Sequence, residues 1–198
     1  MSRKSLIILV ISLVSSFASF AQQGARTAAL KANESKLIYP LYKGSVEMGV
    51  MPVENVQFPF VHKGTCKVVF DVSAATPDSA RNTYNAGLLE AMRILNLHVV
   101  AGVPAEKIDA VVVFHGPAAA SFFNDEVYNK RFKMNNPNGA LIQDLKAHGV
   151  KFVVCGQTLA LRNLTIDAFP AGVQKAYSAR TALSDLQQQG YAVYSLTE

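Results

Sequence analysis

The sequence predicts an α/β domain in which helices cover both faces of a five-stranded, largely parallel sheet, a three-layer α/β/α fold. Three observations favour this class: short apolar runs rich in β-branched residues recur from Thr65 onward, helical patterns alternate with them, and glycines or prolines separate the elements. Strands that alternate with helices pair in parallel, because each helical crossover returns the chain to the same end of the sheet.

The first strand and helix are expected between Thr65 and Gly102. Residues 65–72 form an apolar run, and Thr76-Pro77-Asp78 then supplies an N-cap hydroxyl, a proline in the first turn and an early acid. Apolar residues follow at helical spacing, at Tyr84, Leu88, Met92, Leu95 and Val99. We therefore expect a helix from Thr76 that ends before Gly102.

The remaining elements continue this alternation. In chain order we expect a strand at 108–114, a brief helix at 117–123, a polar loop to Asn136, a helix from Asn136 to Gly149, a strand at 150–155, a strand at 173–177, a helix from Ser178 to Gly190, and a strand at 191–196. Asn136-Pro137 and Ser178 are typical helix starts, and the two glycines are typical ends.

The first residues have the pattern of a secretory signal peptide. Arg3 and Lys4 precede an apolar segment at 6–14 that is too short to span a bilayer comfortably, and Ser19-Phe20-Ala21 is a small-x-small cleavage site. An uncleaved membrane anchor is the alternative, although no stop-transfer flank follows. Cleavage after Ala21 would give a protein of the periplasm or the exterior, with no stable membrane insertion afterwards.

After the signal peptide at 1–21, we expect an N-terminal extension at 22–60 and the α/β domain at 61–198. The extension begins with a polar, alanine-rich stretch that is either a tether or a weak helix. It continues with prolines among apolar and aromatic residues, which is typical of an extended strap that lies over a domain.

Several function classes lack support in the sequence. The formal net charge is +5, of which the signal peptide contributes two, and the remaining basic residues form no run with interleaved aromatics, so no nucleic-acid partner is indicated. No phosphate-binding loop, nucleophile elbow or CxxC motif is present, which argues against nucleotide-binding, ordinary hydrolase and thioredoxin classes. The histidines lack metal-ligand spacing, so we expect no metal and no cofactor.

The two cysteines are expected to be free thiols. Cys66 lies near the start of its strand, whereas Cys155 ends its own. In a parallel sheet these positions lie at opposite ends, on the order of 15–20 Å apart at ~3.3 Å per residue. A disulfide needs Cα atoms within about 7 Å of each other. We therefore expect a structural Cys66 and an accessible Cys155.

Cys155 is the main candidate for chemistry. Its strand stops at Cys155-Gly156 and a helical pattern begins at once, so the thiol lies where free N–H groups and the helix dipole stabilise a thiolate. His115 ends the preceding strand and is expected nearby, where it would lower the pKa of the thiol or move its proton. The alternatives are structural: a small buried hydrophobe at Cys155, a turn residue at His115, a loop anchor at Asp71 and a helix cap at Ser178.

Two segments resemble the DsrE/DsrF-like family. They are residues 150–158, preceded by Asn136-Pro137 and its helix, and the C-terminal segment that begins with Ser178-Ala179-Arg180 and ends at Gly190-Tyr191. The resemblance covers roughly residues 65–198. It implies a three-layer fold with a five-stranded parallel sheet and association into trimers or hexamers. It also implies a cysteine that carries sulfur as a persulfide, a role that falls on Cys155 alone.

Three hypotheses about function follow. The first is a periplasmic sulfur-handling protein, an exported member of the family, in which Cys155 carries a persulfide between unknown donor and acceptor proteins. Such a protein is a sulfurtransferase-type carrier more than a turnover enzyme, and no other enzyme class is indicated. The second is a non-catalytic oligomeric assembly or small-ligand-binding module that retains the family core. The third is a redox-responsive thiol.

Overall fold

The computed structural model describes residues 24–197, so the predicted signal peptide lies outside the described residues. One sheet of five strands has the order β4-β3-β2-β1-β5, and every neighbouring pair is parallel. The strands are β1 (Cys66–Val72), β2 (Ile108–Phe114), β3 (Lys151–Cys155), β4 (Gln174–Ala176) and β5 (Ala192–Leu196). The predicted fold class is confirmed.

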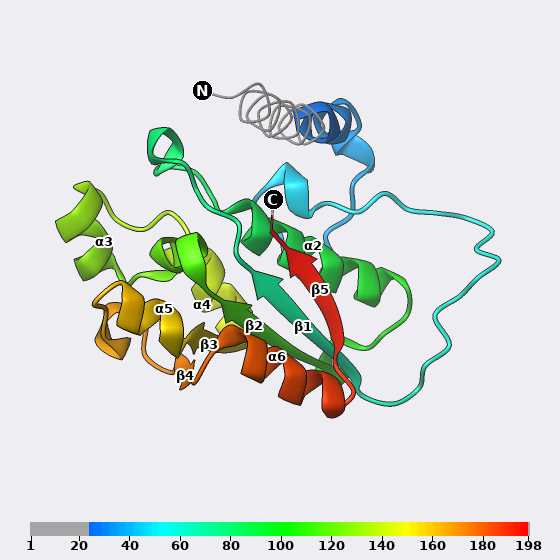
Figure 1. Ribbon diagram of the computed structural model, residues 1–198. Helices are drawn as coiled ribbons and strands as arrows, with labels where there is room; N and C mark the ends of the chain where they lie inside the picture. The colour runs from blue at the N-terminus through cyan, green and yellow to red at the C-terminus, as the bar shows by residue number, and fades with distance from the viewer. Residues whose placement is uncertain (1–23, 198) are drawn as a thin grey trace, which may run out of the picture.

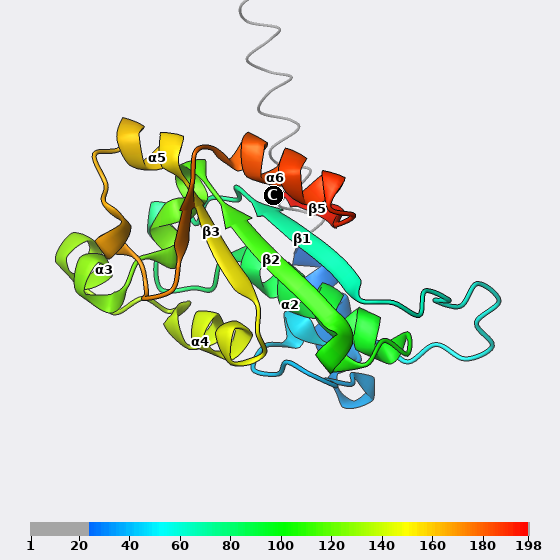
Figure 2. The same ribbon diagram turned by 90° about the horizontal axis from the view of Figure 1, so that it is seen from below.

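Helices lie on both faces of the sheet. Figure 2 shows α6 over one face and α2 and α4 over the other. In the described residues, the helix at 24–32 is followed by the α-helices α2 (Ala86–Val100), α3 (Asp125–Phe132), α4 (Gly139–Ala147), α5 (Gly156–Leu161) and α6 (Ala179–Gln188). Short 3-10 segments are η1 (Glu34–Lys36), η2 (Val46–Met48), η3 (Asp78–Ala80), η4 (Ala105–Lys107), η5 (Gly116–Phe122) and η6 (Ile166–Ala168). Within residues 24–197, no helix has the length and apolar character needed to cross a membrane.

The two faces of the sheet contribute to two separate apolar clusters. Because side chains alternate along a strand, Phe70 of β1 packs into the large cluster with α2 and α4, whereas Val69 packs into a smaller cluster beneath α6. The smaller cluster also contains Val113, Cys155 and Ala179. The candidate cysteine is therefore on the α6 face of the sheet.

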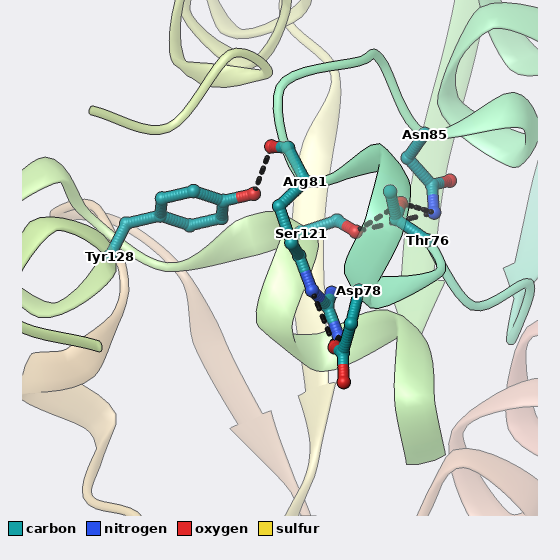
Figure 3. Close-up of polar contacts among 6 residues, drawn as sticks. All are labelled: Thr76, Asp78, Arg81, Asn85, Ser121 and Tyr128. Carbon is teal, nitrogen blue, oxygen red and sulfur yellow. Dashed lines mark hydrogen bonds and ion pairs between the residues drawn. The ribbon is translucent and has the colours of Figure 1, made fainter. Parts of the chain in front are cut away.

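The predicted helix start at Thr76 is wrong. α2 begins at Ala86, and its N-cap is Asn85, whose side chain accepts a hydrogen bond from the Leu88 N–H. Thr76 is buried, and its hydroxyl shares a hydrogen bond of 3.0 Å with Ser121 (Figure 3). That hydroxyl thus joins the loop after β1 to η5 (Gly116–Phe122), and a side chain used in this way does not cap a helix.

The expected polar loop before Asn136 contains the helix α3. Asn124 caps it by accepting a hydrogen bond of 2.9 Å from the Val127 N–H, and acidic side chains occupy its first turn, where the helix dipole favours them. Tyr128 is the one buried residue of this helix. Val127 and Phe132 are only partly buried and the other residues of α3 are polar, so hydrophobic periodicity is weak here, whereas the cap and the charges do indicate a helix.

Residues 37–50 lie against α2 and are held there by one buried side chain. Asn96 of α2 accepts hydrogen bonds from the N–H groups of Leu41 at 3.0 Å and Tyr42 at 2.8 Å. It also donates to the carbonyls of Tyr42 at 2.8 Å and Met48 at 2.9 Å. Tyr42 and Met48 are themselves part of the large apolar cluster, so this part of the extension contributes to the core.

Residues 51–64, here called the arm, extend away from the rest of the protein, as the cyan loop in Figures 1 and 2 shows. Several of its apolar side chains are exposed, and Phe58 is 95% exposed. Phe60 packs edge-on against His98 of α2 with a ring separation of 5.8 Å. This contact joins the returning part of the arm to the domain before β1 begins.

Candidate functional site

Three reactive side chains occupy the carboxyl end of the sheet, on the face that α6 covers. Asp71 belongs to β1, His115 follows β2, and Cys155 ends β3, and these three strands are neighbours. Phe114 pairs with Val154, so the next residues in register, His115 and Cys155, lie opposite each other. The expectation that His115 lies beside the cysteine strand therefore agrees with the sheet order.

Cys155 is buried, and the prediction of an accessible thiol is wrong. The residue is 6% exposed and belongs to the apolar cluster beneath α6. The end of β4 approaches very closely: Ala176 pairs with Cys155, and a Cβ atom placed on Gly156 would lie 2.6 Å from the carbonyl oxygen of Ala176. The chain continues from there into α6, whose first residue, Ala179, packs in the same apolar cluster as Cys155.

Backbone donors offset the burial of Cys155. Burial raises the pKa of the thiol. Nearby donors lower this pKa by more than burial raises it, and they are the N–H groups of Thr158 and Ala179, the Thr158 hydroxyl and the Gln157 N–H. The pKa of Cys155 is therefore lowered from its ordinary value of 9.0. Gln157 and Thr158 lie in the first turn of α5, and Ala179 is the first residue of α6. Two helix N-termini thus converge on one sulfur, an arrangement that stabilises a thiolate.

The Thr158 side chain connects the sulfur to the loop after β2. Its hydroxyl oxygen accepts a hydrogen bond of 2.9 Å from the backbone N–H of Gly116, while the hydroxyl proton is directed to Cys155. Thr158 is buried with the cysteine. Thr158 ends the strand-to-helix segment at 150–158, but no sequence pattern indicates this role.

His115 is paired with Asp71. The Nε2 atom of His115 lies 2.8 Å from Oδ1 of Asp71, and both side chains are partly buried. The hydrogen bond to Asp71 raises the pKa of the imidazole, burial opposes this, and the charges of Asp71 and Cys155 raise the pKa again. The charge of Arg180 lowers the pKa of the imidazole. Together these effects raise that pKa from its ordinary value of 6.5. The imidazole therefore lies within the electrostatic reach of the cysteine on one side and of α6 on the other.

The structure changes the interpretation of Asp71 and confirms that of Ser178. Asp71 is the partner of His115, not a loop anchor. Ser178 caps α6 by accepting a hydrogen bond of 3.0 Å from the Thr181 N–H, within a capping box. Asp71 lies two residues after Val69, which shares an apolar cluster with Cys155, so strand alternation places Asp71 on the same face as the cysteine.

Cys66 lies far from this site. Residue 66 pairs with Ile108, the first residue of β2, so it is about 23 Å from the Cys155 end of the sheet at ~3.3 Å per residue. Both thiols are free, as predicted, and burial raises the pKa of Cys66. In the part of the chain that the structure describes, no group of three His, Cys, Asp or Glu side chains is placed to hold a metal ion.

Comparisons with known proteins extend these observations. The sequence model of the DsrE/DsrF-like family matches residues 67–195. Among solved structures, a protein of unknown function, MTH1491 from Methanobacterium thermoautotrophicum, is 20% identical, with a TM-score of 0.49 over 65% of this chain and 96% of that one. The ychN protein from E. coli is 16% identical, with a TM-score of 0.45 over 67% of this chain and 98% of that one. No curated protein matches the chain.

Proposed function

Because the chain belongs to the DsrE/DsrF-like family, we propose that it is a sulfur-handling protein in which Cys155 accepts a sulfur atom as a persulfide and passes it to an acceptor. The predicted signal peptide at 1–21 supports an extension of the proposal, namely that this exchange takes place in the periplasm or outside the cell. The family resemblance supports a further extension, a homo-oligomeric carrier, with three or six copies, that meets separate donor and acceptor proteins.

One observation carries the proposal: Cys155 is the N-cap residue of α5 and packs in one apolar cluster with Ala179, the first residue of α6, so two helix N-termini adjoin its sulfur. A persulfide is more acidic than a thiol, so the same donors that stabilise the thiolate also stabilise an anionic persulfide. The low exposure of Cys155 has a second benefit, because a loaded sulfur held beneath α6 is kept away from water and from oxidants.

The chemistry is an exchange of one sulfur–sulfur bond for another. The Cys155 thiolate attacks the outer sulfur of a donor persulfide, the donor S–S bond breaks, and a new S–S bond forms at Cys155. The donor leaves as a thiolate and takes up a proton. Discharge repeats the exchange with an acceptor thiolate as the attacking group, so that neither step requires an external oxidant or reductant.

Mass spectrometry of the purified protein after exposure to inorganic polysulfide tests the proposal. We expect Cys155 to gain about 32 Da, the mass of one sulfur atom, and to lose it on treatment with a thiol reductant. Cys66→Ser is the matched control and should gain the same mass, whereas Cys155→Ser should gain none. A folded wild-type protein that gains no sulfur at Cys155 would contradict the proposal, and a gain of oxygen instead would support a redox-responsive thiol.

A second candidate function rests on a different observation. Cys155 is packed among the apolar residues beneath α6, in the way of a purely structural cysteine. In a non-catalytic assembly or small-ligand-binding module, that packing would be the only role of the residue. Cys155→Ser would then keep the oligomeric state but lose thermal stability, because a smaller hydroxyl replaces a packed sulfur, and neither protein would take up sulfur.

A further inference from the structure

Asp71, His115 and Cys155 form a row across three adjacent strands. The strands β1, β2 and β3 are hydrogen-bonded neighbours, about 4.8 Å apart in a regular sheet. Asp71 and Cys155 alternate with core-facing residues so that both lie on the α6 face, and His115 lies between them at the end of β2. The contact between Asp71 Oδ1 and His115 Nε2, at 2.8 Å, joins two members of the row directly.

The Asp71 carboxylate determines which ring nitrogen of His115 carries a proton. An ionised carboxylate only accepts hydrogen bonds, so the Nε2 atom that it contacts must be the N–H donor. Within residues 24–197, no hydrogen bond engages the other ring nitrogen, Nδ1. That atom is the one left to accept or release a proton when the chemistry at Cys155 requires it.

We propose that Asp71 is a positioning residue for His115, and that His115 moves the proton during sulfur exchange at Cys155. This inference rests on the proposed function for its reaction, and on the row of side chains for its geometry. His115 is suited to the task because its side chain is 31% exposed, whereas Cys155 is 6% exposed. The imidazole thus connects the buried sulfur with solvent.

The proton balance is closed without any further group. The proposed exchange starts from a His115 imidazolium beside a Cys155 thiolate, a pair in which the negative charge of the thiolate favours the imidazolium. As the thiolate takes the outer sulfur of the donor persulfide, the imidazolium gives its Nδ1 proton to the departing donor thiolate. The neutral imidazole then accepts the proton of the new persulfide at Cys155. The loaded form is therefore again an imidazolium beside a sulfur anion, and the donor is released as a neutral thiol.

The charges around His115 explain why Asp71 is needed. Asp71 on β1 and the Cys155 thiolate on β3 favour the imidazolium, whereas Arg180 on α6 opposes it. Without the Asp71 carboxylate, the ring would face the arginine with only the thiolate to balance it. The thiolate would then lose much of its positive neighbour, and a higher pH would be required to form it.

The pH profile of Cys155 alkylation tests the inference. The rate of reaction with iodoacetamide is measured against pH in three proteins. They are Cys66→Ser alone, Cys66→Ser with Asp71→Asn, and Cys66→Ser with His115→Gln. We expect the midpoint to rise by about one pH unit in both variants. Asp109→Asn is the matched control: it removes a hydrogen-bonded carboxylate on β2 at the far end of the sheet, and its midpoint should not move.

Nitrogen NMR of His115 in the wild-type protein provides a measurement that does not depend on any variant folding. We expect the neutral ring to carry its proton on Nε2. A neutral ring protonated on Nδ1, or a folded Asp71→Asn variant with an unchanged midpoint, would overturn the inference. If the wild type takes up no sulfur but Asp71→Asn still shifts the midpoint, the proposed function fails and Asp71 remains the positioning residue of His115. If sulfur is taken up and the midpoint does not shift, the inference alone fails.

Discussion

The backbone N–H of Gly116 donates a hydrogen bond of 2.9 Å to the side-chain oxygen of Thr158. This bond fixes the loop after β2 to the first turn of α5, and it orients the hydroxyl so that its proton is available to Cys155. One side chain thus links the end of β2, the end of β3 and the sulfur.

Thr158→Val should make Cys155 a weaker thiolate. The substitution preserves the shape of the side chain but removes the hydroxyl donor, so the pKa of Cys155 should rise by roughly half a unit to one unit, as expected for the loss of one hydrogen bond. The rate of alkylation against pH measures this shift. Thr158→Ser, which keeps the hydroxyl, should match the wild type, and an equal shift in both variants would refute the role of the hydroxyl.

Gly156→Ala should destabilise the protein. The new Cβ atom would lie 2.6 Å from the carbonyl oxygen of Ala176 and 3.0 Å from that of Tyr177, so β4 and the start of α6 would have to move. We expect a loss of about 1–3 kcal/mol in the free energy of unfolding, measured with urea. Gly139→Ala is the control, because its nearest neighbour is 3.9 Å away, and it should be close to neutral. Equal stability of the two variants would contradict this account.

Asn96→Ala should release residues 37–50 from α2. The substitution leaves the N–H groups of Leu41 and Tyr42 without their acceptor and two carbonyls without their donor. Unsatisfied buried groups cost about 1–3 kcal/mol each, so a loss of at least about 2 kcal/mol is expected, with faster hydrogen exchange at Leu41 and Tyr42. Asn129→Ala, on the exposed surface of α3, should change neither quantity. Unchanged exchange in Asn96→Ala would show that the segment is held by other contacts.

Glu90 should contribute to the acid sensitivity of the fold. Burial raises the pKa of Glu90. Hydrogen bonds from Arg93 at 2.8 Å and Arg26 at 2.7 Å have the larger, opposite effect, so the pKa is lowered from its ordinary value of 4.5. A lowered folded-state pKa stabilises the fold above the unfolded value, and the contribution disappears as the pH falls through the folded value. Between about pH 5 and pH 3, the free energy of unfolding should therefore fall less steeply in Glu90→Gln than in the wild type. Glu126→Gln, on the surface of α3, should retain the wild-type loss, and identical curves for all three proteins would contradict the prediction.

The strands were predictable because each is a short run of β-branched residues between turn signals. Strand β2 has the predicted bounds, and Cys155 ends β3 as expected. The position of the cysteine follows from this local pattern alone. The neighbouring position of His115 required one further inference, that consecutive strands joined by a helix lie side by side.

The parts that could not be predicted depend on contacts between distant segments. The pairing of Asp71 with His115 depends on the register of β1 against β2, which no local pattern specifies. The burial of Cys155 depends on β4 pairing with β3 and on the start of α6 packing against the cysteine. The late start of α2 depends on Thr76 binding Ser121, a residue far along the chain. In each case a tertiary contact overrides a local preference.

The capping box of α6 has a kinetic consequence. Ser178 and Thr181 tie down the helical turn whose first N–H faces the sulfur, so a reagent too large to enter must wait until that turn frays. The rate of reaction of Cys155 with small inorganic reagents should rise in proportion to their concentration. With bulky disulfides the rate should instead reach a maximum equal to the rate at which the turn frays. Under the proposed function, the two hydroxyls at the start of α6 would limit the rate at which a donor or acceptor protein exchanges sulfur with Cys155.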